Sequence, residues 1–288
     1  MGDQPAEQTV NDSASAAAPA KTGIENKKQQ RPLHPKPKAP LKKEVRILML
    51  HGYTQSGPLF RAKTRALEKL LAKALAPLHL VPALLYPTAP NRLSPRDIPG
   101  FVPAEEGAAD AEPDSWAWFR RDEANGTYRH LEEGMMRLAE TIAEARGDGD
   151  VGIDGVVGFS QGGSVAAMLA AAMEGREVGS EGDRRWVEAV RKANGGRPLR
   201  FAVVYSGFWA TPGWLGWLYE PKVVTPTLHF LGSLDTVVEE GRSRGLVERC
   251  EGALVVVHPG GHYVPVSREW VMPLVGFIRK CVEEEAKL

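Results

Sequence analysis

The stretch IDGVVGFSQGGSVAAMLAAAM, residues 153–173, decides the fold. Its first seven residues form a short apolar run that predicts a buried strand, and residues 164–173 predict a helix. Between them lies a G-x-S-x-G motif at 158–162. Glycines at both flanks permit a tight turn that lifts the Ser160 hydroxyl above the end of a sheet. The motif alone is weak evidence, but its place between a strand and a helix is the one where a nucleophilic serine functions.

Short apolar runs alternate with helical patterns on both sides of this stretch. Further strands are predicted at 45–50, 78–86, 201–206, 227–232 and 253–258. Helices are predicted at 60–75, at 128–142, near 239–249 and from about Ser267. Pro82 weakens the strand at 78–86, which we therefore expect at a bulge or at the edge of the sheet. Strands joined through helices predict an α/β fold with a single, mostly parallel sheet and helices on both faces.

The overall charge balance hides two unlike regions. The 288 residues have 36 basic and 36 acidic side chains, a balance that argues against a nucleic-acid-binding protein. Residues 1–43 carry a net charge of +4 and few large apolar side chains, so we expect a disordered, basic and proline-rich tail. Residues 44–288 are expected to form the folded domain. No apolar run is long enough to span a membrane, and we expect a cytoplasmic protein, with the nucleus as an alternative.

Two segments interrupt the regular pattern. Residues 87–113 contain six prolines and predict a functional loop or lid. Residues 175–197 are polar and glycine-rich, and we expect an insertion there. The two cysteines, Cys250 and Cys281, are expected to be reduced packing residues, and no metal site is predicted.

A serine hydroxyl needs a general base and an acid that orients the base. Asp235 follows the strand at 227–232, and His262 follows the strand at 253–258. The order Ser160, Asp235, His262 is the order of an α/β-hydrolase triad. His258 is the rival base because it ends the same strand, and His51 is expected to support the site without transferring a proton.

Acyl transfer also requires donors for the oxyanion of the tetrahedral intermediate, usually two backbone N–H groups. One is expected at Gln161, directly after the nucleophile. The second is expected in the loop LHGYTQSG (50–57), at Tyr53, with Thr54 as the adjacent alternative.

Several motifs in the same order resemble the FSH family of serine hydrolases, a family common in fungi that includes the human ovarian-cancer-associated hydrolase. The resemblance runs from Val45 to about Val282. It is carried by ILMLHGYTQSG, YPTAP, WAWF, YRHLEEGMMRLAETI, GFSQGGSVAAML, YSGF, LGSLDTVV and HPGGHYVP. The resemblance implies an α/β-hydrolase fold and a triad of Ser160, Asp235 and His262.

The resemblance implies hydrolysis of small carboxylic esters or thioesters without a metal or organic cofactor. Because some fungal relatives release acyl chains from polyketide synthases, a thiohydrolase that acts with an acyl-carrier partner is the alternative enzyme. A non-catalytic binding protein on the same fold is the alternative of another class. Four aromatic residues are expected to line an apolar acyl pocket: Trp116, Trp118, Phe208 and Trp209.

Overall fold

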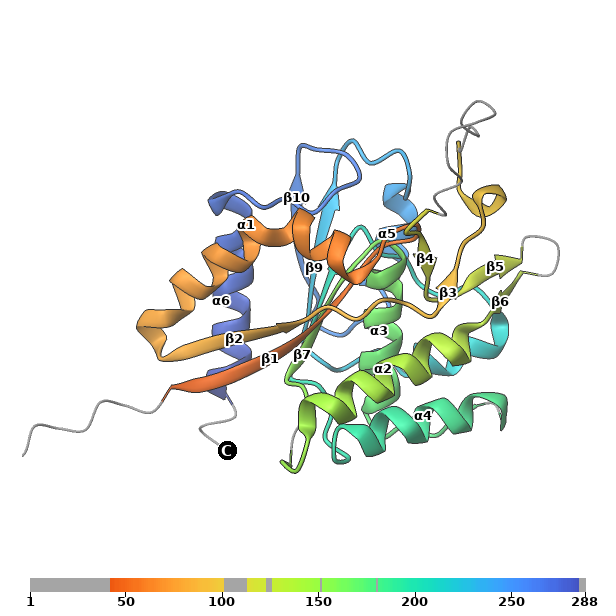
Figure 1. The fold of residues 1–288 in the computed structure, drawn as a ribbon, viewed down its shortest axis with the longest axis horizontal. Coiled ribbons are helices and arrows are strands. Elements are labelled where there is room, and N and C mark those ends of the chain that lie inside the picture. Colours follow the sequence, from red (N-terminus) through yellow and green to blue (C-terminus); the bar gives the residue numbers. More distant parts are fainter. Residues whose placement is uncertain (1–41, 101–112, 123–125, 151, 180, 285–288) are drawn as a thin grey trace, which may run out of the picture. The chain divides into compact units, whose positions relative to one another are not determined.

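Six parallel strands form the central sheet of the protein (Figure 1). The computed structural model describes residues 42–100, 113–122, 126–150, 152–179 and 181–284. The strands are β1 (Lys43–Leu50), β2 (Leu80–Leu85), β7 (Gly155–Phe159), β8 (Phe201–Tyr205), β9 (Thr227–Gly232) and β10 (Leu254–His258). Their order across the sheet is β10-β9-β8-β7-β1-β2, and every pairing is parallel. The predicted α/β fold and parallel sheet are confirmed.

Strand β2 occupies one edge of the sheet, as Pro82 predicted. A proline has no N–H to donate, so it fits a strand with one unpaired side. The predicted tail, residues 1–43, lies outside the described residues except for Lys42 and Lys43, and β1 begins at Lys43.

Helices cover both faces of the sheet (Figure 1). Helices α1 (Gly57–Leu75) and α6 (Arg268–Glu284) pack on one face and on each other. The other face is covered by α2 (Leu131–Arg146), α3 (Gln161–Met173), α4 (Glu181–Ala193) and α5 (Glu240–Val247). In the described part of the chain, none of these helices is both long enough and apolar enough to cross a bilayer.

Helix α1 illustrates how the sequence fixes a helix. The Ser56 hydroxyl caps its N-terminus by accepting the Leu59 N–H (3.4 Å), and a proline follows in the first turn. The residues spaced three and four apart along it are the buried ones: Gly57, Phe60, Thr64, Leu67, Leu71 and Leu75.

The short elements lie in the loops. They are η1 (Ala76–Leu78), β3 (Asn91–Arg92), η2 (Pro95–Asp97), β4 (Trp116–Ala117), β5 (Arg120–Asp122), β6 (Thr127–Arg129) and η3 (Gly213–Leu218). Tyr128 lies in β6, although the predicted helix began there; the helix starts at Leu131 because the left-handed backbone of His130 (φ 63°) separates the two. Of the predicted loop 87–113, residues 101–112 lie outside the described residues.

The polar, glycine-rich insertion at 175–197 contains a helix that the sequence did not predict, α4 at Glu181–Ala193. Helix α4 forms there and buries Trp186, Val187 and Val190 against the core that includes α2 and α3. The Trp186 indole N–H donates to the Asp183 carboxylate (2.9 Å), which the Trp217 indole also donates to (3.1 Å).

The strand order places a topological switch point between β1 and β7. The chain proceeds from β1 outward to β2 on one side and from β7 outward to β10 on the other. Loops that leave the carboxyl ends of β1 and β7 therefore diverge above the sheet, which is where ligands bind in open α/β sheets.

The buried His229 in β9 gives the folded state a dependence on pH. Burial lowers its pKa to about 4, and its Nε2 atom finds no hydrogen-bond partner among the described residues. A histidine in the unfolded chain has a pKa near 6.5. As the pH falls below 6.5, the unfolded chain therefore binds a proton at this residue while the folded chain does not. Stability is therefore lost between pH 6.5 and about 4, by about 3 kcal/mol at most for this residue.

We expect His229→Leu to flatten this dependence because leucine has no group to protonate. Urea unfolding at pH 7.5 and pH 5 measures it: the variant should lose less stability than the wild type between the two. Some dependence should persist, since burial also lowers the pKa of His51 to about 4. Equal losses in the two proteins would contradict the prediction.

Candidate active site

The turn between β7 and α3 holds Ser160 in a strained conformation. Its φ of 54° and ψ of −117° lie outside the regions that side-chain-bearing residues favour. The backbone crosses closely here: a Cβ on Gly158 would clash with the Gly162 carbonyl, and a Cβ on Gly162 would clash with the Leu50 carbonyl. Two glycines are thus required to present Ser160 at the N-terminus of α3.

A chain of two hydrogen bonds joins Ser160 to residues distant in the sequence. His262 Nε2 lies 2.9 Å from Ser160 Oγ, and His262 Nδ1 lies 2.8 Å from Asp235 Oδ2. An ionised carboxylate only accepts hydrogen bonds, so Nδ1 carries the proton and Nε2 is free to accept the serine hydroxyl proton. The structure brings together the three residues that the sequence singled out.

Asp235 is held in place by the backbone that follows it. Its second oxygen, Oδ1, accepts the N–H groups of Val237 and Val238, each at 2.9 Å. Burial by itself raises the pKa of this carboxyl group, but the hydrogen bonds from His262 and from the Val238 N–H outweigh it and hold the pKa below its ordinary value. Asp235 is therefore held as a carboxylate at neutral pH.

The rival base, His258, points elsewhere. It is buried at the end of β10, where its Nδ1 accepts the Gly260 N–H (3.2 Å) and its ring packs against Tyr263 and Trp270. Burial lowers the pKa of His258, although the charge of Asp235 opposes that shift. No contact between His258 and Ser160 exists among the described residues.

The loop after β1 contributes Tyr53 to the pocket that holds Ser160. Tyr53 and Gln161 line the same pocket as Ser160. The Thr54 N–H already donates to the Trp116 carbonyl (3.1 Å), whereas the described part of the chain offers the Tyr53 N–H no acceptor. Of the two candidates in this loop, the geometry thus favours Tyr53 over Thr54.

Two polar side chains fix the loops around Ser160. The neutral His51 ring accepts the Ala89 N–H at Nε2 (3.0 Å), so its Nδ1 donates to the Gly52 carbonyl (2.8 Å). The Gln161 amide accepts the Trp118 N–H and donates to the Phe119 carbonyl, both at 2.8 Å. His51 therefore supports the first loop, as expected, and Gln161 ties residues 118–119 to the elbow.

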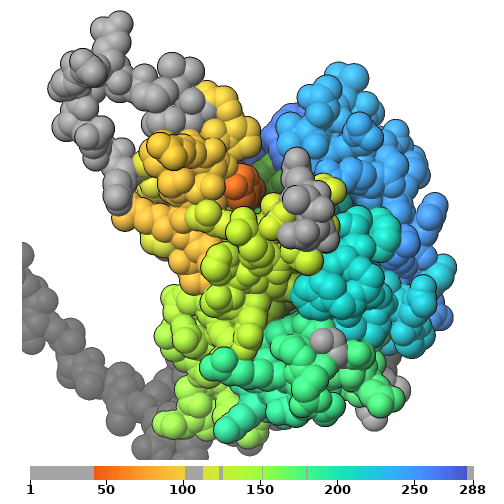
Figure 2. All heavy atoms as spheres, turned by 90° about the vertical axis from the view of Figure 1, so that its right-hand side faces the viewer, coloured from red at the N-terminus to blue at the C-terminus, as the bar shows by residue number. Residues whose placement is uncertain are grey.

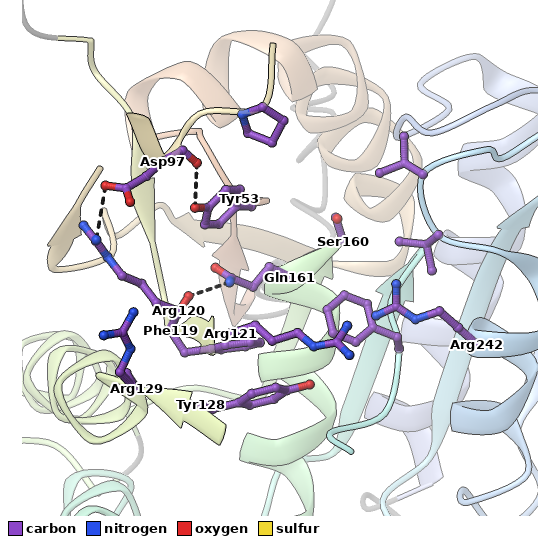
Figure 3. A pocket seen from close by; sticks show the side chains of 14 residues that line it. Tyr53, Asp97, Phe119, Arg120, Arg121, Tyr128, Arg129, Ser160, Gln161 and Arg242 are labelled. Carbon is purple, nitrogen blue, oxygen red and sulfur yellow. Dashed lines mark hydrogen bonds and ion pairs between the residues drawn. The ribbon is translucent and has the colours of Figure 1, made fainter. Parts of the chain in front are cut away.

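A pocket of about 350 Å³ opens directly on Ser160 (Figure 3). Figure 2 shows the face on which it opens, between the golden-yellow segment around η2 and the blue segment around α5. Its apolar wall consists of Pro99, Phe119, Tyr128, Phe208, Val237 and Val238. Its charged lining consists of Asp97, Arg120, Arg121, Arg129 and Arg242.

Of the four aromatic residues predicted to line the pocket, the structure places Phe208 there. Trp118 is fully buried instead, and its indole N–H donates to the His51 carbonyl (2.9 Å). The Trp116 indole donates to Asp114 (2.8 Å), and the Trp209 ring packs under Arg249 (3.6 Å). These three tryptophans support the loops around the site and lie outside the described lining of the pocket.

The arginines of the pocket could not be identified from the sequence. Arg120 and Arg121 belong to the short strand β5, and Arg242 belongs to α5. In the sequence these arginines look like ordinary charged surface residues, because only the fold brings β5 and α5 to Ser160.

The sequence matches the model of the family described as serine hydrolase (FSH1) over residues 41–274. It is 33% identical over 245 residues to Family of serine hydrolases 2 of Saccharomyces cerevisiae, which covers 82% of this chain and 96% of that protein. It is 31% identical over 246 residues to Esterase OVCA2 of Danio rerio, covering 82% of this chain and 97% of that protein.

A protein of Schizosaccharomyces pombe named dihydrofolate reductase is 32% identical over 229 residues, but this chain spans 45% of its length. Among solved structures, esterase PE8 is similar with a TM-score of 0.51 at 19% identity, over 84% of this chain and 93% of that one. That likeness shows the α/β-hydrolase fold.

Proposed function

Because this chain belongs to the FSH1 family of serine hydrolases, we propose that it cleaves carboxylic esters or thioesters with a triad of Ser160, His262 and Asp235. The family and its relatives make the protein a carboxylic ester hydrolase or thioesterase. The observation that carries the proposed triad is the pair of hydrogen bonds from Asp235 through His262 to Ser160.

In the first half-reaction, Ser160 Oγ attacks the carbonyl carbon of the substrate while His262 Nε2 accepts the hydroxyl proton. Asp235 stabilises the imidazolium that forms. The carbonyl oxygen becomes an oxyanion, which accepts the backbone N–H groups of Tyr53 and Gln161. When the tetrahedral intermediate collapses, the alcohol or thiol leaves with the proton from His262 and an acyl-serine remains.

In the second half-reaction, His262 removes a proton from water, and the resulting nucleophile attacks the acyl-serine carbonyl. The same two N–H groups stabilise the second oxyanion. Collapse returns the proton to Ser160 Oγ and releases the carboxylic acid, so the enzyme is restored.

The apolar wall of the pocket supports an acyl chain with an apolar stem. Phe208 and the exposed side chain of Val237 lie beside Ser160 in this pocket, and an apolar chain laid against them would be removed from water. The proposal includes thioesters as substrates because their cleavage begins with the same attack by Ser160 and passes through the same oxyanion. Delivery of the acyl chain by a carrier protein is the second form of this proposal, and action in the cytoplasm stays a prediction.

A fluorophosphonate probe tests the proposal, because it phosphonylates a serine only where a base and an oxyanion site activate it. We expect the purified protein to label at Ser160 and to hydrolyse short 4-nitrophenyl esters. Failure to label where a known serine hydrolase labels would support a non-catalytic protein. Comparison of a free thioester with the same acyl chain on a carrier protein separates the two forms of the proposal.

A further inference from the structure

Two arginines that line the pocket beside Ser160 have no carboxylate partner among the described residues. Arg121 extends from β5 and Arg242 from α5, on opposite sides of the pocket, and both side chains point toward its middle (Figure 3). No ion pair joins either of them to an acidic side chain in the described residues. Two like charges brought to one cavity repel each other, an arrangement that an anion between them would relieve.

The other charges of the pocket are already matched. Arg120 pairs with Asp97 (3.1 Å) and Arg129 with Asp122 (3.7 Å). Asp97 is further held by two hydrogen bonds from Ser94, one from its N–H (2.9 Å) and one from its hydroxyl (2.6 Å). The hydrogen bonds from Ser94 lower the pKa of Asp97, and the charge of Arg120 lowers it further. The Asp97 carboxylate is therefore already paired with Ser94 and Arg120.

Arg242 is also pre-positioned. Its guanidinium lies over the Phe208 ring, 4.5 Å from the centroid, and it is half-buried. Packing on an aromatic face restricts the motion of the guanidinium. Its N–H groups can still donate hydrogen bonds in the plane of the guanidinium itself. Phe208 thus contributes an apolar surface to the pocket that holds Ser160, and it also positions the Arg242 cation in that pocket.

From this arrangement we propose that Arg121 and Arg242 bind an anionic oxygen group of the substrate, a carboxylate or a phosphate, while the ester or thioester carbonyl lies at Ser160. The inference rests on the proposed function and adds the substrate class: an acyl compound with an apolar stem and a negative charge. Carboxylate and phosphate share the geometry that guanidinium groups bind in pairs of hydrogen bonds. The charge belongs either to the far end of the acyl chain or to the leaving group.

Two matched substrate pairs separate these sources. Monoethyl adipate and ethyl hexanoate have the same acyl length and leaving group but differ by a terminal carboxylate. Hexanoyl-4′-phosphopantetheine and hexanoyl-pantetheine share the acyl group and differ only by the phosphate of the leaving group. For the wild type we expect kcat/KM to favour the anionic member of one pair by about tenfold or more, mostly through KM.

Arg121→Gln and Arg242→Gln should each reduce that ratio severalfold, and the double variant should bring it close to one. The exposed Arg65 of α1 provides the matched control: it is not among the residues that line the pocket, so Arg65→Gln removes the same charge and should leave the ratio unchanged. Because each variant is judged by a ratio of two substrates, partial loss of folded protein cancels.

A preference for the neutral member of both pairs, or an anion preference that survives in the double variant, would overturn the inference. In either case, fluorophosphonate labelling of Ser160 and turnover of the neutral esters would leave the proposed hydrolase function intact. If the wild type neither labels nor hydrolyses any member of the two pairs, the proposed function fails and this inference fails with it.

Discussion

Ser160→Ala should abolish fluorophosphonate labelling and lower kcat for ester hydrolysis by on the order of 10⁴-fold or more. The alanine has no oxygen to attack the carbonyl, so no acyl-enzyme can form. His262 and Asp235 remain hydrogen-bonded to each other in the variant, but they have no nucleophile to serve. Gel fluorescence after labelling and stopped-flow release of 4-nitrophenol measure the two effects.

The structure supplies a matched control for this substitution. Ser164 lies one turn further along α3, is fully buried, and its hydroxyl has no partner among the described atoms. Ser164→Ala removes the same hydroxyl from the same helix and should retain both labelling and turnover. Alanine at 160 meets the same positive φ as serine, so the thermal midpoint of Ser160→Ala should stay near that of the wild type. Labelling that persists in Ser160→Ala would show that another residue is the nucleophile.

The strands could be predicted because a sheet covered on both faces needs continuous apolar strands. Strands β7, β8 and β9 are buried at every residue; β7 and β8 appear in the sequence as uninterrupted apolar runs, and β9 as an apolar run that contains Thr227 and His229. The elbow could be predicted for a related reason: close backbone crossings at Gly158 and Gly162 exclude side chains, so the glycines mark the turn.

Helix α4 could not be recognised with the same ease. It is strongly amphipathic and short, and only Trp186, Val187 and Val190 reach the core as large apolar side chains. Charged residues make up much of the rest, and glycines lie on both sides of it, so the segment has the composition of an exposed insertion. Its helical state depends on a partner face on α2 and α3, which local sequence does not contain.

The pocket depends still more on tertiary structure. Tryptophans were plausible lining residues because aromatic side chains often line acyl pockets, yet Trp118 lies in the core and its indole N–H donates to the His51 carbonyl. The residues that do surround Ser160 include two adjacent arginines, Arg120 and Arg121, and Arg242 more than a hundred positions later. Nothing in either local sequence indicates that the two segments meet, so the charge of the pocket emerges only from the fold.

His262→Ala should lower kcat/KM for ester hydrolysis by on the order of 10³-fold or more, while His258→Asn should keep most of the activity. His262 is the ring that bridges Ser160 and Asp235, at 2.9 and 2.8 Å. Without it, the serine hydroxyl proton has no acceptor, and the leaving group has no proton donor. Exogenous imidazole should partly restore turnover in His262→Ala, because a free ring can occupy the space that the substitution opens.

His258 requires a substitution that preserves its structural contact. Its Nδ1 accepts the Gly260 N–H two residues before His262, so loss of that acceptor would loosen the loop that carries the base. The side-chain oxygen of asparagine can occupy the position of Nδ1 and accept the same N–H, whereas it cannot act as a base near neutral pH. His258→Asn therefore tests proton transfer at 258 with the loop kept in place. The base would be His258 instead if both variants fold and lose turnover equally, and if imidazole restores turnover in His258→Asn but not in His262→Ala.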